Sequence, residues 1–130
     1  MMFRVWGHEN IRGTHKNTFE FTKDEFVTVD GDCIVGIRAD FDLNKLREFV
    51  KNNSHVRIVL KCGGLEEVIV AKTNPDFDDE VEFVVRLGEY ASKRTFAVRA
   101  DKAAKHFNRE LIRALQMGSP MEVRIEKAVE

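Results

Sequence analysis

The chain has few cysteines, prolines and tryptophans. Among 130 residues there are two cysteines, two prolines and one tryptophan. Cys33 and Cys62 have no short-spaced partner, which excludes a zinc knuckle or a redox pair built from cysteine alone. Basic and acidic residues nearly cancel, at 21 against 22, so no global field draws the protein toward nucleic acid or a membrane.

Long apolar runs are also missing. No stretch approaches the roughly 20 residues needed to span a bilayer, and the first residues begin directly on a strand pattern without a signal-peptide core. We therefore expect a cytoplasmic protein with no membrane partner. The hydrophobic share of 43% and the charged share of 33% suit one folded domain over residues 1–130. The single glutamine, Gln116, beside that charge is typical of thermophilic proteins.

Alternation of apolar and polar residues predicts that β-strands dominate the fold. We expect strands at residues 2–7, 15–22, 56–60, 67–71, 81–87, 94–99 and 123–125. Asp30-Gly31 has the chemistry of a two-residue turn, because glycine accepts positive φ without a steric clash. Residues 26–29 and 33–37 are therefore expected to form a hairpin.

Two segments space their apolar residues as a helix does. One covers residues 43–51, with Asp40 or Asp42 as its N-cap. The other is the longest, runs from 102 to 116 with Asp101 as N-cap, and ends before Gly118. The predicted fold class is α+β, with two helices and a mostly antiparallel sheet.

Two parts of the chain, 25–62 and 82–126, present short motifs in the same order. Each has Glu-Phe-Val, then Arg-Ala-Asp, then Arg-Glu within the expected helix, and finally Val-Arg-Ile. We interpret them as an internal repeat of β-hairpin, helix and strand. A ligand site would then lie between the halves.

Polar side chains are most concentrated between Gly7 and Glu20. The stretch holds His8, Asn10, Thr14, His15, Asn17, Thr18 and Glu20 around two glycines. Such a density faces a ligand or solvent. One interpretation makes Thr18, Glu20 and Thr22 the wet face of an edge strand, with Lys16 opposing edge pairing; the other makes the stretch part of a pocket.

Two reactive sites can be drawn from these residues. His8 and His15 with Glu20 or Asp32 would offer two imidazoles and a carboxylate to a divalent metal, although the same histidines would serve equally to bond backbone groups. Cys33, beside Asp32, would be a nucleophile if an imidazole took its proton. Its apolar strand favours the other interpretation, a small core residue.

Cationic residues suggest two further contacts. Arg94, Thr95 and Lys102 bracket the strand before the longest helix and would bind a phosphate or carboxylate, although Asp101 would oppose it. One basic helix face, which would contact RNA or a protein chiefly through Lys105, Arg109 and Arg113, is made up of Lys102, Lys105, His106, Arg109 and Arg113. The acidic residues 76–82 would neutralise that face within the molecule or in a homo-oligomer.

Four motifs together resemble the archaeal domain of unknown function 371. They are Gly7-His8-x-Asn10-Ile11, Thr14-His15-Lys16-x-Thr18-x-Glu20-x-Thr22, Gly31-Asp32-Cys33-Ile34, and Arg94-Thr95 followed by Ala100-Asp101-Lys102-Ala103-Ala104. The resemblance spans nearly the whole chain. It implies an archaeal origin and a single compact domain, but no reaction. Residues 89–92 depart from the pattern expected before Arg94.

We therefore predict a polar pocket formed by residues 8–20, Asp32 and Arg94 that binds a small anionic ligand. His8 or His15 would act as acid, base or ligand contact, Glu20 would orient or accept a proton, and Arg94 would pair with the anion. Acid/base or metal-assisted catalysis would fit such a pocket. The alternative is an RNA- or protein-interaction module built on the basic helix face.

Overall fold

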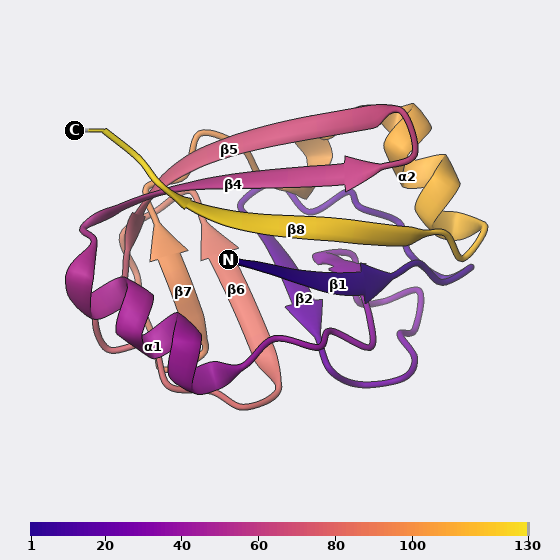
Figure 1. The fold of residues 1–130 in the computed structure, drawn as a ribbon. Coiled ribbons are helices and arrows are strands. Elements are labelled where there is room, and N and C mark those ends of the chain that lie inside the picture. Colours follow the sequence, from indigo (N-terminus) through magenta and orange to yellow (C-terminus); the bar gives the residue numbers. More distant parts are fainter. Residues whose placement is uncertain (130) are drawn as a thin grey trace.

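The computed structural model describes residues 1–129, which form one eight-stranded sheet and two α-helices (Figure 1). The strands are β1 (Met2–Trp6), β2 (Thr18–Thr22), β3 (Ile34–Gly36), β4 (His55–Cys62), β5 (Leu65–Thr73), β6 (Glu82–Arg86), β7 (Thr95–Val98) and β8 (Pro120–Lys127). The helices are α1 (Leu43–Asn52), the short 3-10 helix η1 (Ala104–His106) and α2 (Arg109–Gln116). Neither α-helix among these residues is long and apolar enough to cross a membrane.

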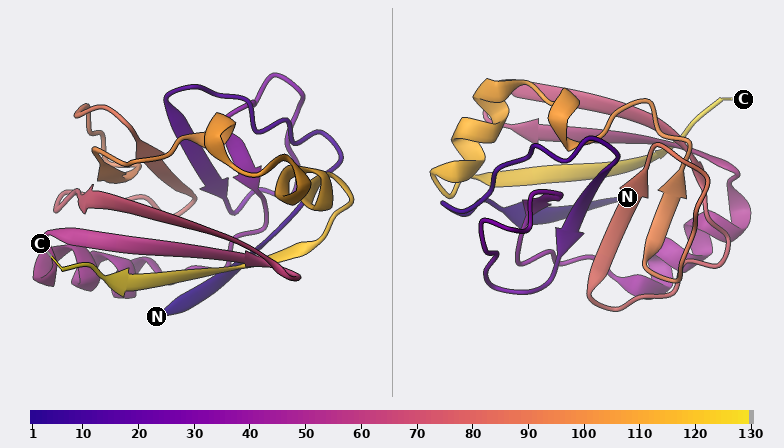
Figure 2. Two further views of the ribbon diagram at one scale, coloured as in Figure 1. Left: turned by 90° about the horizontal axis from the view of Figure 1, so that it is seen from above. Right: turned by 180° about the vertical axis from the view of Figure 1, so that it is seen from behind.

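The sheet closes on itself. Its strand order is β1-β8-β4-β5-β7-β6-β2-β3. Trp6 at the end of β1 and Ile37 just after β3 exchange two backbone hydrogen bonds of 2.8 Å, which join the outer strands. Figure 2 shows β1, β4, β5 and β8 as one wall of the resulting barrel and β2, β6 and β7 as the other, while Figure 1 places α1 and α2 at opposite ends.

The predicted α+β class with a mostly antiparallel sheet is confirmed. In residues 1–129 only the pairs β2–β3 and β6–β7 are parallel, and the other named pairs are antiparallel. Alternation places one face of each strand inside the barrel. The interior therefore takes the apolar half of every strand.

Phenylalanine rings fill this interior. Phe3 lies 5.9 Å from Phe21 and 5.4 Å from Phe83 between ring centroids, in edge-on contacts, and Phe83 stacks on Phe96 at 4.3 Å. Edge-on and stacked pairs are the arrangements that aromatic quadrupoles favour. Because side chains occupy the barrel centre, polar side chains of these strands lie on the outer face.

The longest predicted helix is shorter than expected. Residues 102–116 divide into η1 and α2, and Asn108 caps α2 by accepting a hydrogen bond from the backbone N–H of Glu110 at 2.8 Å. The chain breaks there because Glu67 of β5 accepts the N–H of Asn108 at 2.6 Å. Asp101 is not the cap, since its Oδ1 accepts the N–H of Val70. The earlier helix is confirmed as α1, with Asp42 as N-cap.

The predicted hairpin around Asp30-Gly31 is wrong. Gly31 donates its N–H to the carbonyl of Thr28, and Ile34 donates to the carbonyl of Gly31, so two successive turns replace the first strand. β3 then pairs in parallel with β2 rather than with residues 26–29. The hairpin element of the proposed repeat therefore does not exist.

The order of the strands nevertheless has a two-fold symmetry. If β1, β2, β3 and β4 are matched with β5, β6, β7 and β8, matched strands have matched neighbours in the sheet, provided that the Trp6–Ile37 bridge is counted as a pairing of β1 with β3. Arg38 and Arg99 share a positive φ, 53° and 51°, which is rare outside glycine. Asp40 exchanges two hydrogen bonds with the backbone of Arg4, and Asp101 does so with Val70. These matches agree with an internal duplication, which stays a prediction. They make β6 the counterpart of β2 and not of Glu25-Phe26-Val27, so that part of the predicted match is wrong.

Gly7, directly after β1, lies too close to α2 for any side chain to fit. A Cβ on Gly7 would lie 1.9 Å from the carbonyl oxygen of Leu115, whereas one on Gly64 would meet nothing within 4 Å. We expect Gly7→Ala to lower the free energy of unfolding by about 2–3 kcal/mol or more, and Gly64→Ala to change it by less than about 0.5 kcal/mol. Urea unfolding of both variants measures this. Equal stability of the two would contradict the close approach of β1 and α2.

Candidate functional site

β2 carries a buried carboxylate on the outside of the barrel. Phe19 and Phe21 point into the core, and Glu20 points the other way, yet its side chain is only 7% exposed. β2 lies between β6 and β3 and is not an edge strand, so the wet-edge interpretation is wrong. What covers Glu20 defines the candidate site.

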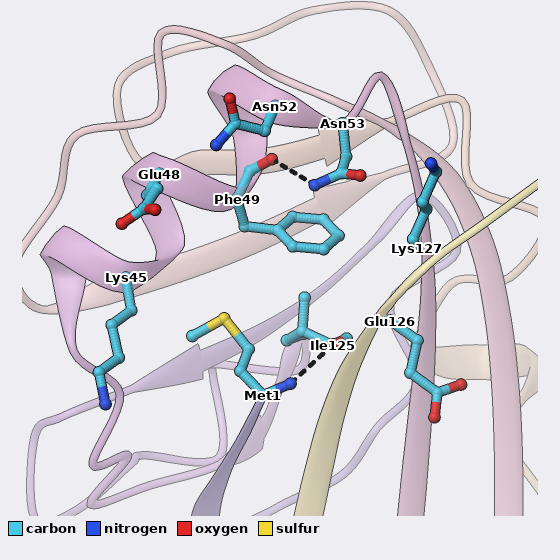
Figure 3. Close-up of a pocket in the computed structure, with 9 residues that line it drawn as sticks. All are labelled: Met1, Lys45, Glu48, Phe49, Asn52, Asn53, Ile125, Glu126 and Lys127. Carbon is cyan, nitrogen blue, oxygen red and sulfur yellow. Dashed lines mark hydrogen bonds between the residues drawn. The ribbon is translucent and has the colours of Figure 1, made fainter.

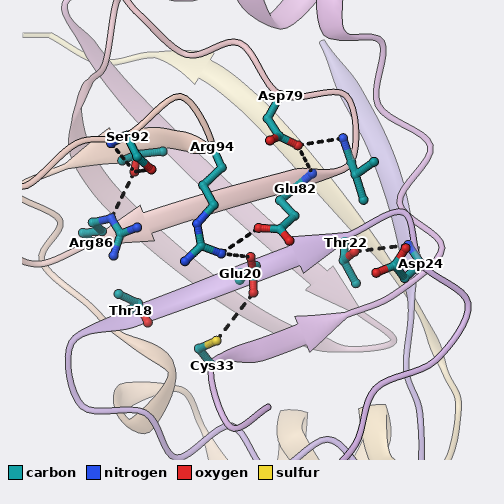
Figure 4. A network of polar contacts seen from close by, with 12 residues as sticks. Thr18, Glu20, Thr22, Asp24, Cys33, Asp79, Glu82, Arg86, Ser92 and Arg94 are labelled. Atoms are coloured by element: carbon teal, nitrogen blue, oxygen red, sulfur yellow. Dashed lines mark hydrogen bonds and ion pairs between the residues drawn. The ribbon is translucent and has the colours of Figure 1, made fainter.

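Three side chains contact or surround Glu20 (Figure 4). The Nη1 of Arg94 donates to Glu20 Oε1 at 3.1 Å and to Glu82 Oε2 at 2.6 Å. The Sγ of Cys33 donates to Glu20 Oε2 at 3.5 Å. Two carboxylates thus share one guanidinium nitrogen, Nη1, and the thiol donates to the second oxygen of Glu20. The structure brings together the predicted residues Glu20 and Arg94, and adds Cys33 and Glu82.

The surroundings shift the proton equilibrium of this carboxyl group. Burial, followed by the hydrogen bond and the negative charge of Glu82, raises the pKa of Glu20 to about 7, and Arg94 opposes the shift. The hydrogen bond with Glu82 in turn raises the pKa of Arg94. Glu20 is therefore an acid that exchanges its proton close to neutral pH.

Cys33 matches neither interpretation of its sequence context. It lies half-buried just before β3 rather than in the core. Burial and the charge of Glu20 raise its thiol pKa to about 12. A thiol that stays protonated is a hydrogen-bond donor and not a nucleophile.

The histidines do not join this cluster. His8 Nδ1 accepts the N–H of Asn10 at 3.0 Å, and His15 Nδ1 accepts the N–H groups of Asn17 and Thr18 at 3.1 Å each. A ring nitrogen that accepts these bonds carries no proton, so the proton of the neutral ring is on Nε2. The interpretation in which His8 and His15 bond to backbone groups is therefore confirmed.

The expected metal arrangement is not formed. Within residues 1–129 no three histidine, cysteine, aspartate or glutamate side chains are placed to hold a metal ion. His15 reaches β2 through the hydroxyl of Thr18, 3.0 Å from Nδ1, and not through Glu20. The two histidines and the carboxylate of the predicted ligand set therefore have separate partners.

The remaining predicted ligand-binding residues bond to other parts of the chain. Asn10 Nδ2 donates to the carbonyl of Val27 at 2.9 Å, and Lys102 Nζ donates to Glu67 Oε1 at 2.7 Å. The backbone carbonyl of Asp32 accepts the N–H of Thr14 at 3.1 Å. These three residues are not gathered around Arg94.

Thr95 has a different role. It is fully buried, and its hydroxyl accepts the Nε–H of Arg86 at 3.0 Å and the backbone N–H of Ser92 at 3.1 Å. Sequence reasoning missed both Arg86 and Glu82. The signal was the alternation of β6, in which Glu82, Val84 and Arg86 share the outer face of the barrel with Glu20.

The grooves found elsewhere do not contain these residues. One of about 470 Å³ lies between α1 and the ends of β1 and β8 (Figure 3). It is lined by Met1, Lys45, Glu48, Phe49, Asn52, Asn53, Ile125, Glu126 and Lys127. Its charged side chains are of both signs, and none of the predicted site residues lines it.

Together, these features define a class: a closed α+β barrel whose outer face carries a buried carboxyl group, a shared arginine and a protonated thiol. The chain belongs to the family described as domain of unknown function DUF371, whose model matches residues 3–128. It is 30% identical over 130 residues to an uncharacterized protein of Methanocaldococcus jannaschii, with 95% of this chain and 96% of that protein covered. The resemblance seen in the sequence motifs is confirmed.

The raised pKa of Glu20 makes stability depend on pH. Between about pH 4.5 and 7 the folded protein holds a proton that the unfolded chain has lost, so the free energy of unfolding falls as pH rises through this window. The contribution of Glu20 is on the order of 3 kcal/mol. We expect Glu20→Gln to remove this part of the pH dependence in urea titrations, and Glu66→Gln, on the exposed surface of β5, to retain it. A Glu20→Gln variant with the wild-type pH slope would refute the assignment.

Proposed function

We propose that the protein binds a small anionic ligand at Arg94 and that Glu20 exchanges a proton as the ligand binds or reacts. The observation that carries this proposal is the buried Glu20 carboxyl group, with a pKa of about 7, on the guanidinium of Arg94. The side chain of Arg94 is 46% exposed, so its outer edge is open to solvent. A ligand can reach the arginine without opening the barrel.

The protonation of Glu20 would control the charge that an anion meets. When Glu20 is neutral, Arg94 is paired with the carboxylate of Glu82 alone. When Glu20 is ionised, two carboxylates surround one guanidinium and repel an incoming anion. Anion binding is therefore coupled to proton uptake, and a ligand bound there lies beside an acid whose pKa suits proton transfer at neutral pH.

Sulfate is a suitable probe because its own charge does not change between about pH 5.5 and pH 9. We expect sulfate to bind with a dissociation constant that rises about tenfold per pH unit above the Glu20 pKa of about 7. Glu20→Gln should retain binding but lose the pH dependence, and Arg94→Gln should abolish binding. Calorimetric or NMR titrations measure both effects.

The matched control is Arg124→Gln, because Arg124 also pairs with a carboxylate, Glu122, but lies on the opposite wall. Its affinity for sulfate should equal that of the wild type. Unchanged binding in Arg94→Gln would overturn the proposal.

A second candidate function, RNA binding, is favoured by the contacts of residues 8–17 with η1 and α2. The carbonyl of His15 accepts the N–H of Lys105 at 3.1 Å, and Gln116 Nε2 donates to the carbonyl of Ile11 at 2.8 Å. These contacts bring the exposed Arg12 and Lys16 to the predicted basic face. The face gains cations that the helix alone does not have.

Part of that face has an internal role. Arg109 donates to the carbonyls of Gly13, Ala104 and Phe107 at 2.9–3.0 Å, and Lys102 pairs with Glu67. The cations left for an external partner are Arg12, Lys16, Lys105 and Arg113.

If RNA is the partner, Lys105→Glu with Arg113→Glu should reduce retention of single-stranded RNA at least tenfold at about 50 mM salt, because binding releases counterions from phosphates. Lys51→Glu with Lys72→Glu makes the same charge change away from this face and should leave retention unchanged. Equal loss in both pairs would show a charge effect without a site.

A further inference from the structure

Arg86 is a half-buried cation on the outer face of the barrel, and no carboxylate among residues 1–129 pairs with it. Among the described residues its partners are the hydroxyl of Thr95, at 3.0 Å from Nε, and the ring of Tyr90, whose centroid lies 5.1 Å from Cζ. No carboxylate pairs with it there, in contrast to Arg94, which has two. A half-buried guanidinium without a counter-charge attracts an anion.

The position of Arg86 is held by contacts that do not involve its Nη groups. Thr95 is fully buried, and its hydroxyl also accepts the N–H of Ser92, so the acceptor is fixed. Tyr90 covers one face of the guanidinium. The two Nη groups, which form the fork that matches phosphate or carboxylate, make no hydrogen bond with the described residues.

The two arginines lie on the same outer face of the sheet. Arg86 lies on β6 directly across from Thr18 of β2, and Glu20 follows two residues later on the same face. Figure 4 shows the side chains of Arg86 and Arg94 extending over this face beside Thr18 and Glu20. An anion held by Arg86 would therefore lie on the same face of β2 and β6 as the proton-exchanging carboxyl group.

Tyr90 supplies a flat apolar surface at this place. Tyr90 is 70% exposed, although burying a large aromatic side chain is favourable. A planar ring can stack on the part of Tyr90 that Arg86 leaves open, as bases stack on aromatic side chains in nucleic-acid-binding proteins.

We propose that Arg86 and Tyr90 form a subsite for a nucleoside phosphate, with the phosphate on the Arg86 fork and the base on Tyr90. This inference deepens the proposed function and rests on it, because it names the class of anion that reaches Glu20 and Arg94. The phosphate has two sources, a free nucleotide or the end of an RNA chain.

The test compares AMP, ribose 5-phosphate and a short 5′-phosphorylated RNA as ligands in calorimetric titrations. We expect AMP to bind about tenfold more tightly than ribose 5-phosphate, because only AMP can stack. Tyr90→Ala should remove that difference and keep ribose 5-phosphate binding. Arg86→Gln should weaken the binding of both ligands about tenfold or more, and Lys93→Gln, in the loop that holds Tyr90, should weaken neither.

Each outcome decides one point. Equal affinities for AMP and ribose 5-phosphate, or no effect of Tyr90→Ala on AMP, would overturn the subsite. If sulfate binding at Arg94 persists in that case, the proposed function stands without the nucleoside phosphate. If AMP binding depends on Arg86 and Tyr90 but sulfate binding is independent of Arg94, the proposed function fails and the subsite remains.

RNA that competes with AMP and depends on Tyr90 would identify the chain end as the source. RNA that binds only through Lys105 and Arg113, with no AMP binding, would overturn the subsite. Circular dichroism and thermal melts of each variant establish that it is folded before its affinity is compared.

Discussion

The closure of one sheet around packed phenylalanine rings is the constraint on which the rest of the structure depends. The Trp6–Ile37 bridge joins the outer strands, and rings from β1, β2, β6 and β7 occupy the centre. A filled barrel has no room for a ligand, so polar chemistry is confined to the outside. Outside, Glu20 is buried because β6 and β3 flank its strand and Arg94 lies over it.

The site lies at one of the places where strands β1–β4 meet strands β5–β8, the pairing of β2 with β6. Glu20 on β2 is paired with Val84 on β6, at the middle of the antiparallel register that joins these two strands. Their backbones are equivalent, since the N–H of Glu20 donates to Cys33 and that of Val84 donates to Arg94. In this comparison Glu20 takes the place of Val84, and Cys33 takes the place of Arg94. That asymmetry concentrates a carboxyl group, a thiol and a guanidinium at one place.

Local patterns predicted most of the helices and strands, but not the places where contacts with distant residues end or redirect them. Alternation located β1, β4, β5, β6, β7 and β8 to within a few residues, and α1 with its Asp42 cap, because these signals act over neighbouring residues. The long helix failed at Asn108, whose N–H is taken by Glu67, 41 residues away. The predicted hairpin is wrong because β3 pairs in parallel with β2, and a local turn motif contains no information about such a pairing.

The sequence by itself determined the family, the α+β class, the amount of apolar core and the residue types able to carry charge and protons. The tertiary structure alone decided which of them meet. His8 and His15, close to Glu20 in the chain, bond to their own loops, whereas Arg94 and Glu82, which come from a distant segment, share its hydrogen bonds. The physical reason is burial. Desolvation raises the pKa of Glu20, and that desolvation exists only when β3 and β6 pair with the two sides of β2.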